Sequence, residues 1–205
     1  MKDHPAQPGG AIRLYGRRVV LRPLTPTDWD QWSEVRQRNE GWLVPWEPLR
    51  PAGMLDPTRD RDAYVSRCHA RDRDRQLGVA YGFGLFVGPD LAGEVNLNGV
   101  VRGAQQTGTI GYWIDEAQAG NRYVAEAVVA VIRFAFEHLH LHRIEICIVP
   151  RNRNSRRVVE GLGLREEGVA LRILEIHGAW EDHVRYAITA EEWDERRDEL
   201  SRAWL

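Results

Sequence analysis

The 205-residue sequence predicts a mixed α/β domain of the α+β kind, with a mostly antiparallel central sheet flanked by helices. Three strand-like runs follow one another between residues 77 and 115, with the turn signals Gly-Pro-Asp and Gly-Ala-Gln-Gln between them. Apolar side chains then recur at helical spacing over residues 121–139, and a further strand-like run covers 142–150. A meander followed by a strand–helix–strand unit favours one mixed sheet.

The N-terminal elements are bounded by proline and by capping residues. Residues 17–25 read as a first strand, which prolines end, and Thr27 is placed to cap a helix with Trp29, Trp32 and Val35 at helical spacing. Residues 40–57 contain four prolines and predict a long irregular loop rich in tryptophan. A helix is expected from Thr58 to about Arg75, and its alternating charges predict a solvated face.

The C-terminal elements follow from periodicity and turn chemistry. Ile144, Ile146 and Ile148 lie on one side of the strand at 142–150, and a short helix after it stops at a glycine. Residues 169–189 predict two strands about a His177–Gly178 turn. Thr189 and Glu192 then form a capping-box pattern for a last helix.

These elements divide the chain into a domain with two short flanks. Residues 1–16 are expected to be a flexible lead-in, residues 17–194 the domain, and residues 195–205 a helical extension of the same domain. No internal repeat or linker interrupts the middle part.

Composition excludes several classes of function. The formal net charge of -2 gives no reason for general attraction to nucleic acid or to an anionic membrane. The two cysteines are far apart and form no CxxC, and His138, His140 and His142 span an expected helix end, so neither a disulfide framework nor a metal site is expected. A cytoplasmic setting, no membrane partner, and a monomer or homodimer are the expectations.

Two strand-to-helix junctions are suited to bind an anion. Gly120 lies in a polar turn before the helix at 121–139, where free N–H groups and the helix dipole favour phosphate. Asn152, Asn154 and Ser155 lie at the next such junction, beside several arginines. Two adjacent anion-binding helix starts suit a long ligand with phosphates at one end, although an ordinary turn would leave the same local pattern.

Four stretches carry a family resemblance: "LVPWEP" at 43–48, "EVNLNGVVRGAQQTGTIGYWI", "LHLHRIEICIVPRNRNSRRVVEGLGLREEG" and "LEIHGAWEDHVRYAIT". Because these four stretches occur in this order, the chain resembles the GNAT superfamily of acetyl-CoA-dependent N-acyltransferases, and within it the RimJ-type ribosomal-protein alanine N-acetyltransferases. The resemblance covers residues 17–194 and implies a GNAT-like fold.

The resemblance implies acetyl-CoA as co-substrate, with no metal. The expected cofactor-binding residues are Trp113, Ile114, Ala119, Gly120, Asn121, Arg122, Tyr123, Val124, Asn152, Asn154, Ser155 and Arg156. The family's pyrophosphate loop has a second glycine where this chain has Arg122, whose side chain is able to pair with a phosphate.

Acetyl transfer to an amine needs a neutral amine, donors for the oxyanion and a proton for the leaving thiolate. Glu94 is the first candidate for a base, and Ser155 and Tyr112 for the proton donor, although strand alternation can instead turn Tyr112 into the core. Glu47, Trp42 and Trp46 are candidates to hold the acceptor.

By resemblance the acceptor is a protein N-terminus. A small amine, such as an antibiotic or polyamine, is the alternative acceptor. A CoA-binding sensor without turnover is the alternative of another class, because the pyrophosphate loop is altered at Arg122.

Overall fold

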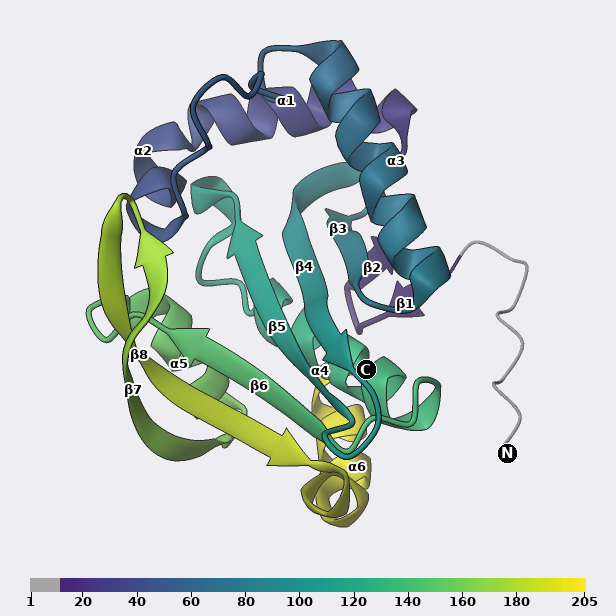
Figure 1. Cartoon of the computed structure of the whole chain (residues 1–205). Coiled ribbons are helices and arrows are strands. Elements are labelled where there is room, and N and C mark those ends of the chain that lie inside the picture. The colour runs from purple at the N-terminus through teal and green to yellow at the C-terminus, as the bar shows by residue number, and fades with distance from the viewer. Residues whose placement is uncertain (1–11) are drawn as a thin grey trace.

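The computed structural model describes residues 12–205, which form one mixed sheet with helices on both faces (Figure 1). Part of the predicted lead-in, residues 1–11, lies outside the described residues. The rest of it enters the sheet, because β1 (Leu14–Tyr15) pairs antiparallel with β2 (Val19–Arg22).

Within the described part of the chain the sheet has eight strands in the order β1-β2-β3-β4-β5-β6-β8-β7. Every neighbouring pair is antiparallel except β5 and β6, which confirms the predicted mixed sheet and its meander. The remaining strands are β3 (Tyr81–Val87), β4 (Asp90–Val101), β5 (Thr107–Ile114), β6 (Arg143–Ile148), β7 (Arg165–Ile176) and β8 (Ala179–Thr189).

One face of the sheet carries the N-terminal helices. The short turn η1 (Pro26–Asp28) leads into α1 (Trp29–Arg38), and the capping box that starts η1 joins Thr25 and Asp28 rather than using Thr27. Helix α3 (Arg61–Leu77) starts at Asp60, whose side chain accepts from the N–H of Ala63. A small cluster packs these helices on β3 and β4: Trp32, Tyr64, Cys68, Phe86 and Leu91.

The other face carries the C-terminal helices and the main core. Helix α4 (Tyr123–Glu137) is buried almost all round, because α5 (Arg153–Gly161) and α6 (Ala190–Trp204) pack against it while the sheet covers its other side. Ile144, Ile146 and Ile148 of β6 are buried in this core, as their alternation predicted. The predicted capping box of Thr189 and Glu192 starts α6.

Two local expectations were wrong. The stretch 40–57 is not irregular throughout, because it begins with helix α2 (Glu40–Leu43) and the turn η2 (Val44–Trp46), in which Pro45 takes an early position that needs no N–H donor. Contrary to the sequence prediction, the charged side chains of helix α3 do not all face solvent. Arg67 and Arg71 turn toward β4, where Arg67 pairs with Glu94 and Arg71 donates to Asn98.

Close strand packing makes Gly93 of β4 a sensitive position. A Cβ built on Gly93 would lie 2.2 Å from the carbonyl oxygen of Trp113 on β5, so the backbone itself would have to shift. We expect Gly93→Ala to lower the free energy of unfolding by about 1–3 kcal/mol, as overpacking does, in a denaturant titration. Gly111→Ala on β5 is the matched control, because its Cβ would lie 3.8 Å from Asn98, an ordinary contact. Equal losses in the two variants would contradict the prediction.

Candidate active site

The parallel strands β5 and β6 separate shortly after they meet. They pair only where Thr107, Gly108 and Thr109 face residues 143–145, although β5 continues to Ile114 and β6 to Ile148. Beyond Thr109 the β6 side of β5 therefore has no partner strand among the described residues. Backbone N–H and C=O groups need partners, so this opening can take an extended ligand through strand-like hydrogen bonds.

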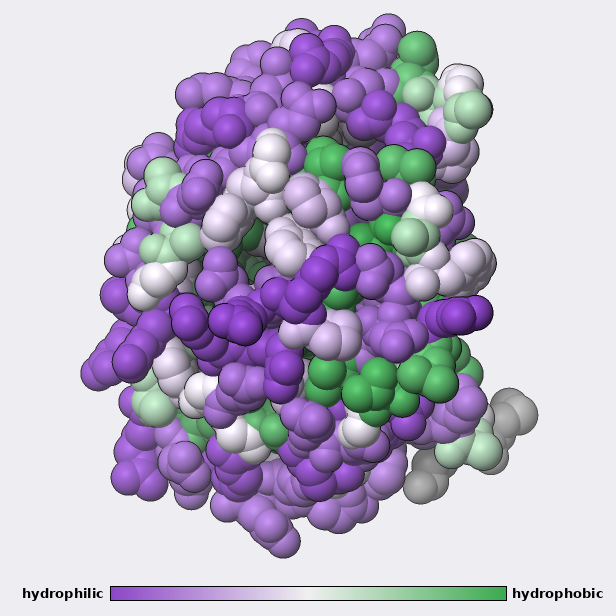
Figure 2. Space-filling view, turned by 90° about the vertical axis from the view of Figure 1, so that its left-hand side faces the viewer, coloured by the Kyte–Doolittle hydropathy of each residue, from purple (hydrophilic) through white to green (hydrophobic). Residues whose placement is uncertain are grey.

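A cleft of about 960 Å³ occupies this opening. It holds all the sequence-predicted site residues except Glu94, Asn121 and Arg156. Its described lining consists of Gly41, Trp42, Leu43, Pro45, Trp46, Glu47, Tyr112, Trp113, Ile114, Gln118, Ala119, Gly120, Arg122, Tyr123, Val124, Ala125, Asn152, Asn154, Ser155, Arg157, Val158, Gly161 and Trp204. Figure 2 shows the side of the molecule on which α2, α5 and the β7–β8 hairpin lie, where near-white and green residues interrupt a mostly hydrophilic surface at mid-height.

The loop before α4 presents backbone donors to the cleft. Gly120 has φ +82° and Arg122 has φ +66°, so both adopt the left-handed region and turn the chain into the helix. The first N–H groups of α4, at Tyr123, Val124 and Ala125, have no partner within the helix and lie at its positive end. This arrangement suits a phosphate.

Asn121 does not join the cleft lining, against expectation. Its side chain donates to the carbonyl of Gln118, and its own carbonyl accepts from Arg18, so both groups serve the loop. Arg18 also pairs with Glu126 and lies 4.8 Å over the ring of Tyr123, which holds the start of α4 against β2.

The start of α5 brings Ser155 and Tyr112 together. Asn152 caps the helix by accepting from the N–H of Ser155, at 3.1 Å. The Ser155 hydroxyl donates to the Tyr112 hydroxyl at 3.0 Å, and Tyr112 donates to the Ser155 carbonyl at 3.0 Å. Burial raises the pKa of Tyr112 well above its usual range, so this phenol keeps its proton at neutral pH. Each hydroxyl hydrogen is engaged within this pair, so a hydroxyl donates to a ligand in the cleft by rotating away from its present acceptor.

Arg157, and not the predicted Arg156, faces the cleft from α5. Arg156 points to β8, where it donates to the Tyr186 hydroxyl and pairs with Glu160. The helix period contains the signal, because Asn154, Arg157, Val158 and Gly161 are spaced i, i+3, i+4 and i+7 and all line the cleft. Trp204 also lines the cleft and was not predicted to do so. It is far in sequence from the other lining residues, and no local pattern connects it to the site.

Glu94 lies outside the described cleft lining. Its side chain points to the opposite face of β4 from Val95, toward α1 and α3, and the residue is only 2% exposed. Trp32 Nε1 donates to one carboxylate oxygen and Arg67 to the other, each at 2.6 Å. Burial alone would raise the pKa of Glu94, but Arg67 and Trp32 outweigh it and hold the pKa below its usual value.

The acceptor candidates form the other end of the cleft. Trp42 donates to the carbonyl of Ile114 at the end of β5 (3.1 Å), and Trp46 lies beneath the guanidinium of Arg151. Glu47 pairs through both oxygens with Arg36 of α1, at 2.7 and 2.6 Å, and its carbonyl accepts from His177 in the hairpin turn. These contacts fix the mouth of the cleft between α1 and the hairpin.

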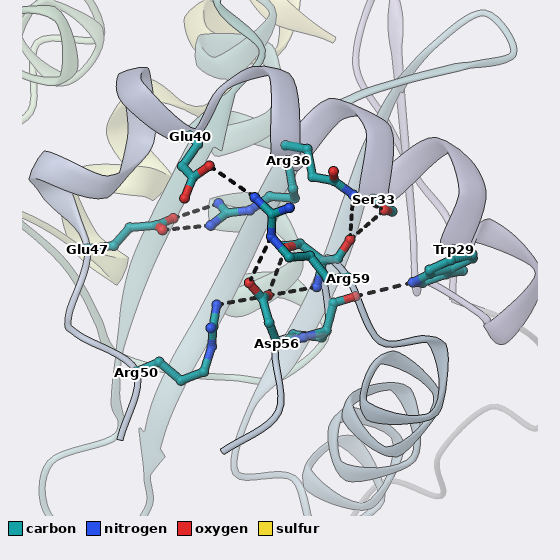
Figure 3. A network of polar contacts seen from close by, with 11 residues as sticks. Trp29, Ser33, Arg36, Glu40, Glu47, Arg50, Asp56 and Arg59 are labelled. Atoms are coloured by element: carbon teal, nitrogen blue, oxygen red, sulfur yellow. Dashed lines mark hydrogen bonds and ion pairs between the residues drawn. The ribbon is translucent and has the colours of Figure 1, made fainter. Parts of the chain in front are cut away.

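A polar network holds the loop that follows Glu47 (Figure 3). Asp56 pairs with Arg50 and Arg59, and Arg59 also reaches Glu40 of α2. The loop is fastened to α1 as well, through bonds from Ser33 to the carbonyl of Thr58 and from Trp29 to that of Pro57. The loop thus keeps a defined position beside the cleft.

A mixed sheet that opens between two parallel strands, with free backbone donors at a helix start beside the opening, is the arrangement expected of an acyl-CoA-dependent transferase. Residues 18–165 match the family described as "Acetyltransferase (GNAT) domain", and the chain belongs to this family. It is 32% identical over 185 residues to the ribosomal protein uS5 alanine N-acetyltransferase of Escherichia coli (strain K12), covering 89% of this chain and 93% of that protein.

Solved structures agree with this result. RimJ of Mycobacterium smegmatis in complex with CoA-disulfide superposes with a TM-score of 0.80 at 32% identity, covering 89% of this chain and 88% of that one. The ribosomal-protein-S5-alanine acetyltransferase of Vibrio fischeri gives 0.79 at 26% identity, covering 89% and 98%. The chain is an N-acetyltransferase that uses acetyl-CoA.

Two kinds of feature are absent from the described residues 12–205. No group of three or more histidine, cysteine, aspartate or glutamate side chains in this range is arranged to hold a metal ion. None of its helices is long and apolar enough to cross a membrane.

Proposed function

We propose that the chain acetylates the N-terminal α-amine of a protein, the type of acceptor that the name of the E. coli relative specifies. The observation that carries the proposal is the charge at the mouth. Of the described residues that line the cleft, Glu47 is the one carboxylate, and Arg36 neutralises it. A polyamine or an aminoglycoside carries several positive charges and would gain little there, whereas a peptide N-terminus brings one amine and a polar backbone.

The cleft residues fit acetyl-CoA as an extended ligand with phosphates at one end. In this proposal the free edge of β5 at Trp113 and Ile114 holds the pantetheine arm, with Asn152, Asn154 and Ser155 on its other side. The N–H groups at Gly120–Val124 and the side chain of Arg122 hold the pyrophosphate. Acetyl-CoA supplies the acetyl group as a thioester.

The hydroxyls of Tyr112 and Ser155 then serve the leaving sulfur. Both lie in the cleft, both are protonated at neutral pH, and a hydrogen bond to a developing thiolate lowers the barrier for its departure. Trp42 and Trp46 wall the path of the acceptor, and Glu47 orients its amine.

Proton removal needs no strong base in this scheme. An α-amine has a reference pKa of about 7.7–8.0, so much of it is neutral near pH 8. Arg67 and Trp32 donate hydrogen bonds to Glu94 and hold its pKa below the usual value, which weakens it as a base. Glu47 is held by Arg36 through both of its carboxylate oxygens. We propose that water takes the proton at the mouth and that Glu94 positions Trp32 and Arg67.

Release of the free CoA thiol tests the function directly. Peptides that begin with Ala or Ser are compared with their N-terminally blocked forms, and with lysine, spermidine and an aminoglycoside. Release that requires a free peptide α-amine is expected. Release with the small amines alone would overturn the proposed acceptor and leave the acetyltransferase assignment intact.

Arg122 gives a prediction with two opposite effects. Arg122→Gly removes a side chain from a left-handed position, so we expect the free energy of unfolding to rise by about 0.5–1 kcal/mol. The same change removes a phosphate partner, so the Kd for CoA should rise about fivefold to tenfold in calorimetry. Arg122→Lys, which keeps the charge, should bind CoA within about threefold of the unsubstituted protein. An unchanged Kd in Arg122→Gly would remove the phosphate role.

A further inference from the structure

Trp204, at the end of α6, lines the same cleft as the phosphate-binding loop although 80 residues of sequence separate it from Val124. Its backbone carbonyl accepts from the N–H of Arg17 at 3.0 Å, which fixes the end of the helix. The side chain is half-buried against the main core, so part of the indole surface remains on the cleft side. A large aromatic surface is therefore held in a defined place on the cleft wall.

Contacts around Arg17 show at which end of the cleft Trp204 lies. The next residue, Arg18, donates from its backbone to Glu126 (2.7 Å) and from its side chain to the carbonyl of Asn121 (2.8 Å). Both partners belong to the start of α4. Trp204 is thus beside the phosphate-binding loop, while the tryptophans of the acceptor mouth, Trp42 and Trp46, belong to the segment that follows α1.

Charge at this end favours a nucleotide. Arg122 and Arg157 line the cleft, are exposed, and form no ion pair with any described residue. Arg156 and Arg18, by contrast, are both paired with carboxylates. These two guanidinium groups share the cleft with the indole of Trp204, and this combination matches a phosphorylated nucleoside, since phosphates pair with arginine and a base stacks on an indole.

We infer that Trp204 is the stacking surface for the adenine of CoA, so that α6 completes the nucleotide end of the cofactor cleft. The inference rests on the assignment of this cleft to acetyl-CoA. It gives the C-terminal helix a binding role in addition to its packing on α4.

The test compares ligands with and without the adenine nucleotide. Isothermal titration measures the Kd of CoA and of 4′-phosphopantetheine for the full chain and for Trp204→Ala. A stacked base contributes about 1–3 kcal/mol, so the Kd for CoA should rise about fivefold to a hundredfold. The Kd for 4′-phosphopantetheine, which has no adenine, should stay within twofold.

Two further variants keep the result interpretable. Trp204→Phe retains an aromatic face and should recover most of the affinity for CoA, including under conditions where Trp204→Ala is poorly folded. Trp180→Ala removes an exposed indole of β8 outside the described cleft lining and should change neither Kd. Melting curves report the fold of each variant.

The outcomes separate the inference from the cleft assignment. An unchanged Kd for CoA in Trp204→Ala, or an equal rise for both ligands, would overturn the stacking role. Failure of the unsubstituted protein to bind CoA would instead overturn the assignment of the cleft. A rise confined to CoA that phenylalanine reverses is the result we expect.

Discussion

Glu94→Gln is expected to lower the melting temperature by about 5–10 °C at pH 7 while reducing kcat less than tenfold. The substitution leaves Arg67 without its carboxylate in a site where the arginine side chain is only 22% exposed. Removing one partner of a buried pair costs about 3–5 kcal/mol, and the partial exposure of Arg67 together with the retained amide oxygen reduces this to about 2–3 kcal/mol. For a chain of this length about 2–4 °C is lost per kcal/mol.

The pH dependence of this loss has a definite sign. The pKa of Glu94 is lower in the folded protein than in the unfolded chain, so its contribution is complete above an unfolded value of about 4.3. That contribution is lost as the pH falls through the folded pKa. The difference in melting temperature between the two proteins should therefore shrink below about pH 4.

Glu145→Gln is the matched control for Glu94. Its side chain pairs with Arg143 but is 24% exposed, and Arg143 keeps Glu167 as a second partner, so a change of about 1 kcal/mol or less is expected. A folded Glu94→Gln protein whose kcat falls a hundredfold, with a changed acidic limb in its pH–rate profile, would show that Glu94 is the base.

The case of Glu94 shows what strand alternation can predict. The period of two places Glu94 and Val95 on opposite faces of β4. Which face meets the cleft depends on where β5 and β6 part, and this follows from pairing between residues more than 30 positions apart. Likewise, nothing local to Arg67 indicates that its helix turns it toward Glu94.

Local signals succeeded where the determining physics is local. The hairpin turn at His177–Gly178, the capping box at Thr189 and the buried isoleucines of β6 all follow from neighbouring residues. Helical periodicity could also have predicted Arg157 in place of Arg156 as a cleft residue, since it identifies the face of α5 that carries Asn154 and Gly161. Trp204 could not have been predicted in this way, because only tertiary packing brings α6 to the cleft.

Tyr112→Phe is expected to reduce kcat about a hundredfold with little change in the KM for acetyl-CoA. The phenol lies in the cleft, and burial keeps it protonated, so it can donate to sulfur when the thiolate leaves. Phenylalanine preserves the ring and its packing, and only the donor is lost. Positioned proton donors contribute about 10²–10⁴-fold. Because the pKa of Tyr112 is raised, the loss should be constant from pH 6 to 9, as initial rates of thiol release would show.

Two variants distinguish catalysis from packing. Tyr186→Phe removes another tyrosine hydroxyl, which contacts Arg156 and Glu160 outside the cleft, and should leave kcat within about twofold.

Ser155→Ala should reduce kcat as well, and the double variant should lose less than the product of the single losses, because the two hydroxyls are hydrogen-bonded to each other. Full additivity would mean that they act separately. An unchanged kcat in Tyr112→Phe would mean that Ser155 alone donates to the leaving sulfur, since its hydroxyl would then be the remaining donor of this pair in the cleft.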